Sequence, residues 1–188
     1  MSEAVSALSG ASYDGIVRVA DAGLQGMIQL RGNLGKAAVK NAVTGVTGVD
    51  FPAARQANVN GERGILWMSP DELLVLVPYA EATQAVETIT MALKKEHHLA
   101  ADVSDARVMF SLEGEGLREV LAKLTPADMS RAGLPVGEMR RTRLAQVAAG
   151  VWLESETSAR VIAFRSVAHY VMGLLTHSAQ PGSEVGHF

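Results

Sequence analysis

The chain is organised around residues 102–175, which begin with the run Arg107-Val108-Met109-Phe110-Ser111-Leu112. The side chains of Val108, Phe110 and Leu112 share one side of this run, because successive residues of a strand point to opposite faces. A helix pattern follows, with apolar residues at i, i+3, i+4 and i+7: Leu117, Val120, Leu121 and Leu124. Two apolar, strand-like runs (144–153 and 160–164) and a helix of residues 166–176 complete this region. The order predicts an α+β fold in which helices cover one face of an antiparallel sheet.

The first half of the chain shows a similar succession of patterns. Residues 16–19 and 27–30 are short strand candidates, and a helix of residues 34–43 is expected after Asn33, which would cap it. A hairpin is predicted for 64–68 and 73–77, around the turn Ser69-Pro70-Asp71-Glu72, because proline presets the backbone angle that a tight turn needs. A helix is expected over 80–96. Residues 45–60 are interpreted as a long loop that either contacts a partner or is simply exposed.

The two halves of the sequence resemble each other. Leu30-Arg31-Gly32 and Leu112-Glu113-Gly114 end equivalent strands 82 residues apart, and Trp67 and Trp152 lie 85 residues apart. This predicts two similar strand-strand-helix-strand-strand-helix halves, residues 14–98 and 99–178, packed about a pseudo-twofold axis. A flexible tail (1–13) and a C-terminal tail (179–188) flank them. Both tryptophans are placed in the core because their rings are costly to expose.

Composition excludes several classes of protein. Of 188 residues, 48% are hydrophobic and 20% charged, the proportions of an ordinary globular domain. The net charge of −3 argues against a nucleic-acid partner, because phosphate binding needs clustered cations. Cysteine is absent, which excludes disulfides and thiolate metal sites. No apolar run approaches the ~18 residues of a membrane span, and the N-terminus does not resemble a signal peptide. A cytoplasmic protein is expected.

The connector after the second-half helix carries the most specific pattern. It reads Leu124-Thr125-Pro126-Ala127-Asp128, then Pro135-Val136-Gly137, then Arg143-Leu144-Ala145-Gln146-Val147. This order of Leu-Thr-x-x-Asp, Pro-x-Gly and a strand pair resembles the folate-binding aminomethyltransferase superfamily. The chain is more closely similar to the sarcosine oxidase gamma subunit family. That closer likeness rests on its short length, Ser-Pro-Asp-Glu-Leu-Leu at 69–74, Asp-x-Ser at 102–104 and Phe-Arg-Ser-Val-Ala at 164–168. The resemblance covers roughly residues 17–177.

This resemblance implies an accessory gamma subunit of a heterotetrameric complex that oxidatively demethylates sarcosine. The products would be glycine, hydrogen peroxide and formaldehyde, or 5,10-methylenetetrahydrofolate when tetrahydrofolate is present. It also implies that FAD, FMN, NAD, zinc and tetrahydrofolate are bound by other subunits and none by this chain. The implied partners are the alpha, beta and delta subunits, mainly alpha.

Glu154 is the candidate folate-facing residue. In the aminomethyltransferases that the chain resembles, a Gly-Gly segment is followed by an Asp pair, and an acid there engages the folate amine. The matching residues here are Ala149-Gly150 and Leu153-Glu154, so one carboxylate remains. Glu154 is either that acid or a solvated turn residue, and the second interpretation is favoured. No catalytic residue is therefore expected in this chain.

The run Arg140-Arg141-Thr142-Arg143 predicts a strand with arginines on both faces. The arginines either protect an exposed sheet edge from stray pairing or meet carboxylates of a partner, and the sequence favours neither. Arg140, Arg141 and Arg143 are thus the candidate subunit interface. No metal site is predicted, because His97 and His98 have no carboxylate at ligand spacing.

Three functions stay open on the sequence alone. The first is a structural gamma subunit of sarcosine oxidase, and the second is a free-standing folate-binding one-carbon transfer protein. The third is a scaffold without folate on the same fold, because a fold does not fix a function.

Overall fold

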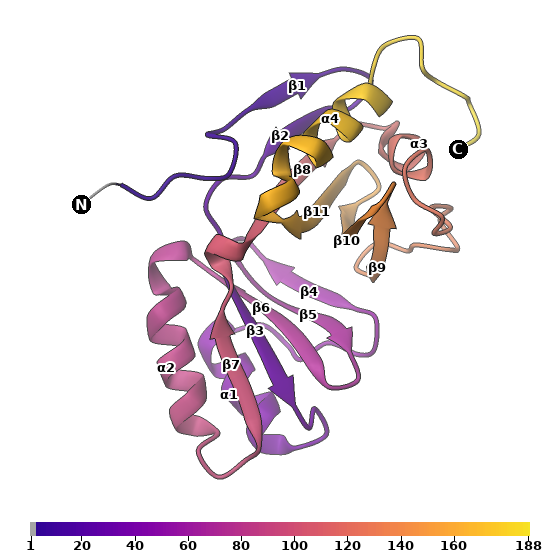
Figure 1. Ribbon diagram of the computed structural model, residues 1–188. Helices are drawn as coiled ribbons and strands as arrows, with labels where there is room; N and C mark the ends of the chain where they lie inside the picture. The colour runs from indigo at the N-terminus through magenta and orange to yellow at the C-terminus, as the bar shows by residue number, and fades with distance from the viewer. Residues whose placement is uncertain (1–2) are drawn as a thin grey trace. The chain divides into compact units, whose positions relative to one another are not determined.

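The computed structural model describes residues 3–188, which form an α+β fold with two antiparallel sheets and four α-helices (Figure 1). The chain divides into two compact units. The inserted unit is Leu24–Asp105, and the flanking unit combines residues 3–23 with Ala106–Phe188. None of the helices in residues 3–188 combines the length and the apolarity needed to span a membrane.

The inserted unit is a five-stranded sheet with two helices. Its strand order is β4-β5-β6-β3-β7. The elements are β3 (Gly26–Gly32), α1 (Ala37–Thr47), β4 (Ala57–Asn60), β5 (Arg63–Ser69), β6 (Glu72–Val77), α2 (Ala82–Ala92) and β7 (His98–Asp102). Val39 and Val43 of α1 and Ile89 of α2 share one core with alternate residues of the central strands, so both helices cover the same face. The predicted β5–β6 hairpin is confirmed, and β6 is buried along its whole length between β5 and β3.

The flanking unit is a six-stranded sheet with two helices. Its strand order is β1-β2-β8-β11-β10-β9. The elements are β1 (Ser12–Asp14), β2 (Arg18–Asp21), β8 (Arg107–Glu113), α3 (Leu117–Ala122), β9 (Met139–Leu144), β10 (Val147–Ser155), β11 (Ser158–Phe164) and α4 (Ala168–Ser178). Val108, Phe110 and Leu112 of β8 face one core together with residues of α3 and α4, as the alternation in the sequence predicts.

The two leading strands are exchanged between the halves. β2 comes just before β3 in the sequence but pairs with β8, where Val19 lies opposite Leu112. β7 comes just before β8 but pairs with β3, where Ala100 lies opposite Leu30. The contact boundaries therefore fall after Gly23 and Asp105, not at the expected division into 14–98 and 99–178. A strand's apolar alternation shows that it is a strand but not which sheet it joins.

Each half contains one strand more than the expected order strand-strand-helix-strand-strand-helix, although the strand predicted for the arginine run 140–143 is present as β9. Three strands follow each connector, because β4 and β9 extend the sheets as edges. β4 has the sequence Ala-Asn-Val-Asn, which carries no apolar run, so it falls inside the segment 45–60 that was expected to be a loop. The helix expected over 34–43 is α1, which begins at Ala37. Asn33 does not cap it, because its side-chain oxygen accepts a hydrogen bond from the Gly35 N–H in a turn before the helix.

The tryptophans are not equivalent residues of the repeat. Each hairpin has a bulge before its turn, where Trp67 pairs with Leu73 and Leu153 pairs with Ala159. Trp67 therefore corresponds to Leu153, and the expected match to Trp152 is wrong by one residue. A shift of one residue reverses the face of a strand. Trp67 is half-buried against the helix-side core of the inserted unit, whereas Trp152 is buried on the face of β10 opposite Val151 and Leu153.

Both terminal segments are held by carboxylates of the flanking unit. Asp21 Oδ2 accepts hydrogen bonds from the Ser6 hydroxyl at 2.6 Å and from the Leu8 and Gly10 N–H groups. Glu119 on α3 accepts hydrogen bonds from the N–H groups of Val185 and Gly186. In the structure the expected tails are thus hydrogen-bonded to the unit, and residues 12–14 of the N-terminal one form β1.

Candidate functional site

A cavity of about 840 Å³ lies at one end of the flanking unit's sheet. Three segments and the end of the chain surround it: the start of α3, the connector between α3 and β9, and the β10–β11 turn. The lining residues are Glu115, Arg118, Ser130, Arg131, Ala132, Glu156, Thr157 and Phe188. Its size is that of a small-molecule site, so the polar groups around it decide what it can do.

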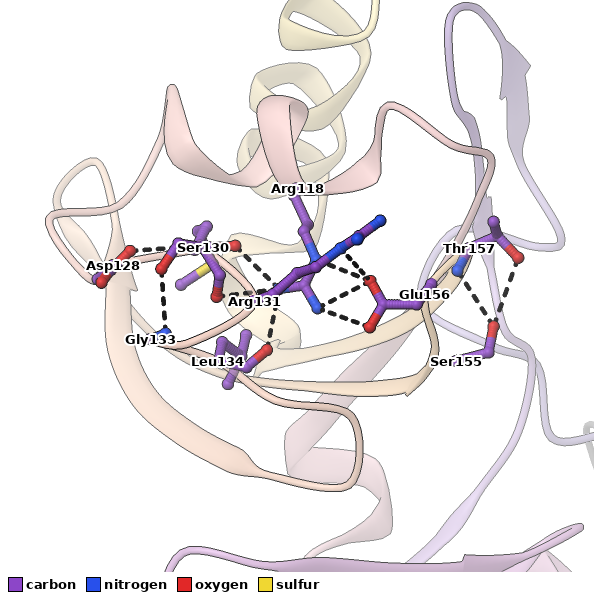
Figure 2. A network of polar contacts seen from close by, with 10 residues as sticks. Arg118, Asp128, Ser130, Arg131, Gly133, Leu134, Ser155, Glu156 and Thr157 are labelled. Carbon is purple, nitrogen blue, oxygen red and sulfur yellow. Dashed lines mark hydrogen bonds and ion pairs between the residues drawn. The ribbon is translucent and has the colours of Figure 1, made fainter. Parts of the chain in front are cut away.

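Arg118 is the centre of the polar network at this cavity (Figure 2). Its side chain is only 6% exposed. Nη1 donates to the carbonyl oxygens of Met129 (2.9 Å), Ser130 (3.2 Å) and Leu134 (2.9 Å), all in the connector. Nε and Nη2 donate to the Glu156 carboxylate in the β10–β11 turn, at 3.2–3.4 Å. One buried guanidinium thus holds the connector and the turn together.

The connector that carries the Leu-Thr-x-x-Asp pattern is also held by its own side chains. The Asp128 carboxylate accepts a hydrogen bond from the Ser130 N–H at 2.8 Å, and the Ser130 hydroxyl accepts one from the Gly133 N–H at 3.0 Å. The bonds from Ser130, together with the nearby Arg140 guanidinium, lower the pKa of Asp128. A Cβ at Gly133 would collide with the Asp128 side chain, so glycine is required there. In this fold the aspartate of the pattern forms a turn.

The network is built to hold chain segments together. Each of the three nitrogens of the Arg118 guanidinium donates to a protein acceptor, and Glu156 is shared with Arg131, whose Nε lies 3.3 Å from it. The lining contains carboxylates, guanidiniums and hydroxyls but no histidine to serve as a base near neutral pH. These groups can bind and position, but they do not form a nucleophile with its base.

Glu154 lies on β10 and is engaged by its own hairpin. Its Oε2 accepts hydrogen bonds from Arg160 Nε at 3.0 Å and from the Ser158 hydroxyl at 3.3 Å. The side chain is 28% exposed. Gly150, the retained glycine of the segment, leaves room for Met139, whose methyl carbon would lie 2.5 Å from a Cβ there. The carboxylate is paired with a cation, and the folate-facing role of Glu154 stays a prediction.

The arginine run forms β9, which is an edge strand of the six-stranded sheet. Protection of an exposed edge, one of the two interpretations of these arginines, requires this position. Arg140 lies on the helix side of β9, and its guanidinium is hydrogen-bonded within the unit. Its Nη2 donates to the Gly133 carbonyl at 2.5 Å and to Glu138 at 2.6 Å. Arg141 and Arg143 lie on the other face and are exposed. The structure therefore separates Arg140, which holds the connector, from the two outer arginines.

The histidines do not converge on a metal site. No group of three or more histidine or carboxylate side chains in residues 3–188 could hold a metal ion. His98 begins β7, and its Nδ1 lies 3.0 Å from the Glu96 carbonyl oxygen.

Sequence patterns did not identify Arg118 or Glu156. The helix pattern assigned the core to Leu117, Val120 and Leu121, but all five residues from 117 to 121 are buried. The available signal is a charged residue inside a short helix that follows Gly114 and Gly116, and this signal does not identify the partner of that residue.

The comparisons with known proteins agree with one another. The sequence pattern described as "Sarcosine oxidase, gamma subunit family" matches residues 31–180. The sarcosine oxidase subunit gamma of Corynebacterium sp. (strain U-96) is 32% identical over 140 residues, which cover 73% of this chain. The match spans 65% of that relative's own length.

Two solved structures extend the comparison to the fold. A chain of the heterotetrameric sarcosine oxidase from Corynebacterium sp. U-96 superposes with a TM-score of 0.78 and 25% identity, covering 87% of this chain and 83% of that one. The glycine cleavage system aminomethyltransferase T from Bartonella henselae gives a TM-score of 0.61 at 12% identity, covering 84% and 44%. The second likeness concerns the fold alone.

Proposed function

The chain belongs to the sarcosine oxidase gamma subunit family, and from this premise we propose that it is the accessory, non-catalytic subunit of a heterotetrameric sarcosine oxidase. The observation that carries the proposal is the family match, which extends over most of both sheets. The complex would oxidatively demethylate sarcosine to glycine, with hydrogen peroxide and formaldehyde or 5,10-methylenetetrahydrofolate. Its location would be cytoplasmic.

The polar groups of this chain support a role in holding rather than in turnover. Arg118, Glu156 and Asp128 are all used to fix the connector, and Glu154 is paired with Arg160. We propose that FAD, FMN, NAD, zinc and tetrahydrofolate are bound by the other subunits. The chain would contribute a rigid surface to the alpha subunit mainly, and to the beta and delta subunits less.

The candidate interface narrows to the outer arginines of β9. Arg140 donates both of its described hydrogen bonds within the flanking unit and is 26% exposed, so it is suited to hold the connector. Arg141 and Arg143 are exposed on the opposite face of the same strand. We propose that Arg143 in particular, of the three candidate arginines, meets the partner, because Arg141 also has an interaction of its own within the chain.

The internal repeat supports descent from a duplicated module. Both halves follow the order strand, strand, helix, three strands, helix, and the sheet orders β4-β5-β6-β3-β7 and β9-β10-β11-β8-β2 correspond strand for strand. We infer that a duplication produced the two halves. The pseudo-twofold axis expected from the sequence stays a prediction.

A free-standing folate-binding one-carbon transfer protein is the alternative. It needs a carboxylate directed at the ligand, and the Glu154 carboxylate instead accepts hydrogen bonds from Arg160 and Ser158. Titration calorimetry of the purified chain with tetrahydrofolate tests this alternative. Saturable heat that is lost in Glu154→Gln would support it, and the absence of heat at high micromolar ligand would remove it.

Co-expression tests the main proposal. The chain should copurify with the other three subunits in equal amounts, as native mass spectrometry of the purified complex would show. Omission of the chain should reduce the yield or thermal stability of the assembly. If a stable, fully active complex of three subunits forms and leaves this chain behind, the proposal is wrong.

A further inference from the structure

Four of the chain's five lysines gather at one end of the inserted unit. They lie in or next to two turns, the one between β3 and α1 and the one between α2 and β7 (Figure 1). These turns adjoin each other, because Gly32 at the end of β3 pairs with His98 at the start of β7. The exposed lysines of this end are Lys36, Lys40, Lys94 and Lys95.

The fold makes little use of these four side chains. Within residues 3–188, the ammonium groups of Lys94 and Lys95 have no hydrogen bond or ion pair. Lys36 Nζ lies 3.8 Å from the Glu96 carboxylate, which makes a long surface ion pair, and Lys40 Nζ lies over the Phe51 ring. The fifth lysine differs, because Lys123 Nζ donates to the Ser183 carbonyl oxygen at 2.6 Å.

An exposed methionine lies beside two of the lysines. Met91, in the last turn of α2, is 64% exposed. Lys94 and Lys95 follow it by three and four residues, and the Lys94 N–H donates to the Met91 carbonyl oxygen, so the turn of the chain brings them to the same side. A docking surface commonly has an apolar centre and a charged rim. We call Met91 and the four lysines together the lysine surface.

The lysine surface has a charge opposite in sign to that of the chain. Glu96 is the one carboxylate in the two turns, so four ammonium groups stand against a single negative charge. The nearby Arg31 is balanced by Asp71 and Glu72, at 3.4 and 2.9 Å. The chain as a whole has a net charge of −3. Such a local excess of cations attracts an acidic partner.

We propose that the lysine surface docks an acidic segment of a partner subunit. The inference rests on the proposed function, because it needs a complex. Carboxylates of that segment would face Lys94 and Lys95, and an apolar side chain between them would cover Met91. A second copy of this chain does not suit the surface, because the same surface of another copy would oppose lysines to lysines.

The lysines after α2 also suit a purely local role. Cations near the C-terminus of a helix stabilise it, because the last carbonyl groups carry a partial negative charge. α2 ends at Ala92, just before Lys94 and Lys95. A local role would change the stability of the isolated chain, whereas docking changes its assembly. The experiment therefore measures both.

Competition for a place in the complex is the main measurement. A Lys94→Gln, Lys95→Gln double variant and the wild-type chain are co-expressed in equal amounts with the other three subunits, and native mass spectrometry counts each in the purified complex. The variant should be incorporated at least about fivefold less than wild type, because it removes two charges that attract the partner.

A Thr83→Glu, Gln84→Glu double variant is the matched control. Both positions are exposed in the first turn of α2, at the end of the helix away from the lysines. The control lowers the net charge of the chain by two, as the lysine variant does. Its incorporation should stay within about twofold of wild type, because the charge changes outside the lysine surface.

Salt separates the charged rim from the apolar centre. Sodium chloride should release the wild-type chain from the purified complex, and the release of the lysine variant should depend less steeply on salt. Met91→Ser should increase the release several-fold at every salt concentration without changing that dependence, because it removes apolar contact alone. The melting temperatures of the isolated variants should lie within about 3 °C of wild type.

Each outcome decides the proposal. Equal incorporation of the lysine variant and wild type would overturn it. Poor incorporation together with melting more than about 3 °C below wild type would assign the lysines to the stability of α2, which also overturns it. Normal incorporation with weakened retention on a heparin column would assign the surface to polyanions, and docking of a subunit would be wrong. If the wild-type chain itself stays out of the complex, the proposed function fails before any variant is compared.

Discussion

The Arg118 guanidinium and the Glu156 carboxylate meet at 3.2 Å, and they join two segments that are 38 residues apart in the sequence. Arg118 is buried on α3, whereas Glu156 sits at the tip of the β10–β11 turn with its side chain 49% exposed. The same guanidinium holds three carbonyl groups of the connector. The connector that carries the Leu-Thr-x-x-Asp pattern therefore depends on one residue outside it, and this dependence can be measured.

Arg118→Ala should destabilise the chain by about 2–3 kcal/mol. The substitution leaves the buried carbonyl groups of Met129 and Leu134 without their hydrogen-bond donor. A buried polar group without a partner lowers the free energy of unfolding by more than a typical hydrogen bond adds to it. Urea unfolding followed by circular dichroism measures the free energy of unfolding.

Arg131→Ala is the control for the Arg118 variant. Arg131 shares Glu156 but is 83% exposed, so its removal should cost no more than about 0.5 kcal/mol. Equal effects of the two substitutions would show that the ion pair dominates and that the three carbonyl bonds contribute little.

Local patterns in the sequence identified most elements but not their partners. The alternation at Val108, Phe110 and Leu112 predicts β8 and the face that it buries, because a period of two is a local property. That β2 pairs with β8 and not with its neighbour β3 depends on contacts about 90 residues away, for which no local pattern exists. The edge strands β4 and β9 carry weak or charged patterns, since one side of an edge strand has no neighbouring strand to pair with.

Side-chain chemistry limited the prediction of the site in the same way. Asn33 suits a helix cap, but the backbone ahead of α1 turns early and uses its oxygen for Gly35. The Leu-Thr-x-x-Asp pattern singles out the connector, whereas Arg118, which holds it in the structure, follows Leu117 in the sequence and carries no pattern of its own. Glu156 lies in a run of polar residues and carries no pattern of its own. Their partnership exists only in three dimensions.

Asp21→Asn should change how stability depends on pH. Burial raises the pKa of Asp21, but hydrogen bonds from Ser6 and from the N–H groups of Gly23, Gly10 and Leu8 together lower it below its ordinary value. A carboxyl whose pKa falls on folding adds stability above its unfolded pKa, near 4, and loses that contribution as the pH falls. The variant should be less stable by about 1–2 kcal/mol at pH 7, and the difference should shrink below pH 4.

Urea titrations at intervals from pH 3 to pH 8 would measure this difference between wild type and variant. Asp14→Asn is the control, because Asp14 is 74% exposed and its carboxylate forms a surface ion pair with Arg18 at 3.3 Å. Its difference from wild type should stay within about 0.5 kcal/mol throughout. A constant difference for Asp21→Asn down to pH 3 would contradict the role of its charge in holding residues 6–10.

Gly15→Ala should be destabilising and Gly173→Ala stabilising. A Cβ at Gly15 would collide with the carbonyl oxygen of Ala179, which already accepts a hydrogen bond from the Ile16 N–H. Neither backbone can move freely, so we expect a loss of about 2–3 kcal/mol. A Cβ at Gly173, within α4, meets nothing, and alanine there should add about 0.5–1 kcal/mol. Thermal unfolding of the two variants would show shifts of opposite sign, and a shared sign would refute the assignment.

The strand exchange predicts which part of the chain each buried valine stabilises. Val19 on β2 is fully buried in the core with Phe110 and Leu112, and Val39 on α1 is 1% exposed in the core of the inserted unit. Truncation of either to alanine removes two methyl groups and should cost about 2 kcal/mol. By sequence position both belong to the first half, yet by contacts they belong to different units.

Hydrogen exchange followed by mass spectrometry distinguishes these assignments, because regions of a fold open with their own free energies. Val19→Ala should speed exchange most in β8 and β11, which adjoin β2 through the sheet, and Val39→Ala should speed it most in β3, β5 and β6. Faster exchange at β3 and β6 in Val19→Ala, with β8 unaffected, would mean that β2 belongs to the sheet of its sequence neighbour. The two valines would then act on one unit, and the exchanged topology would be incorrect.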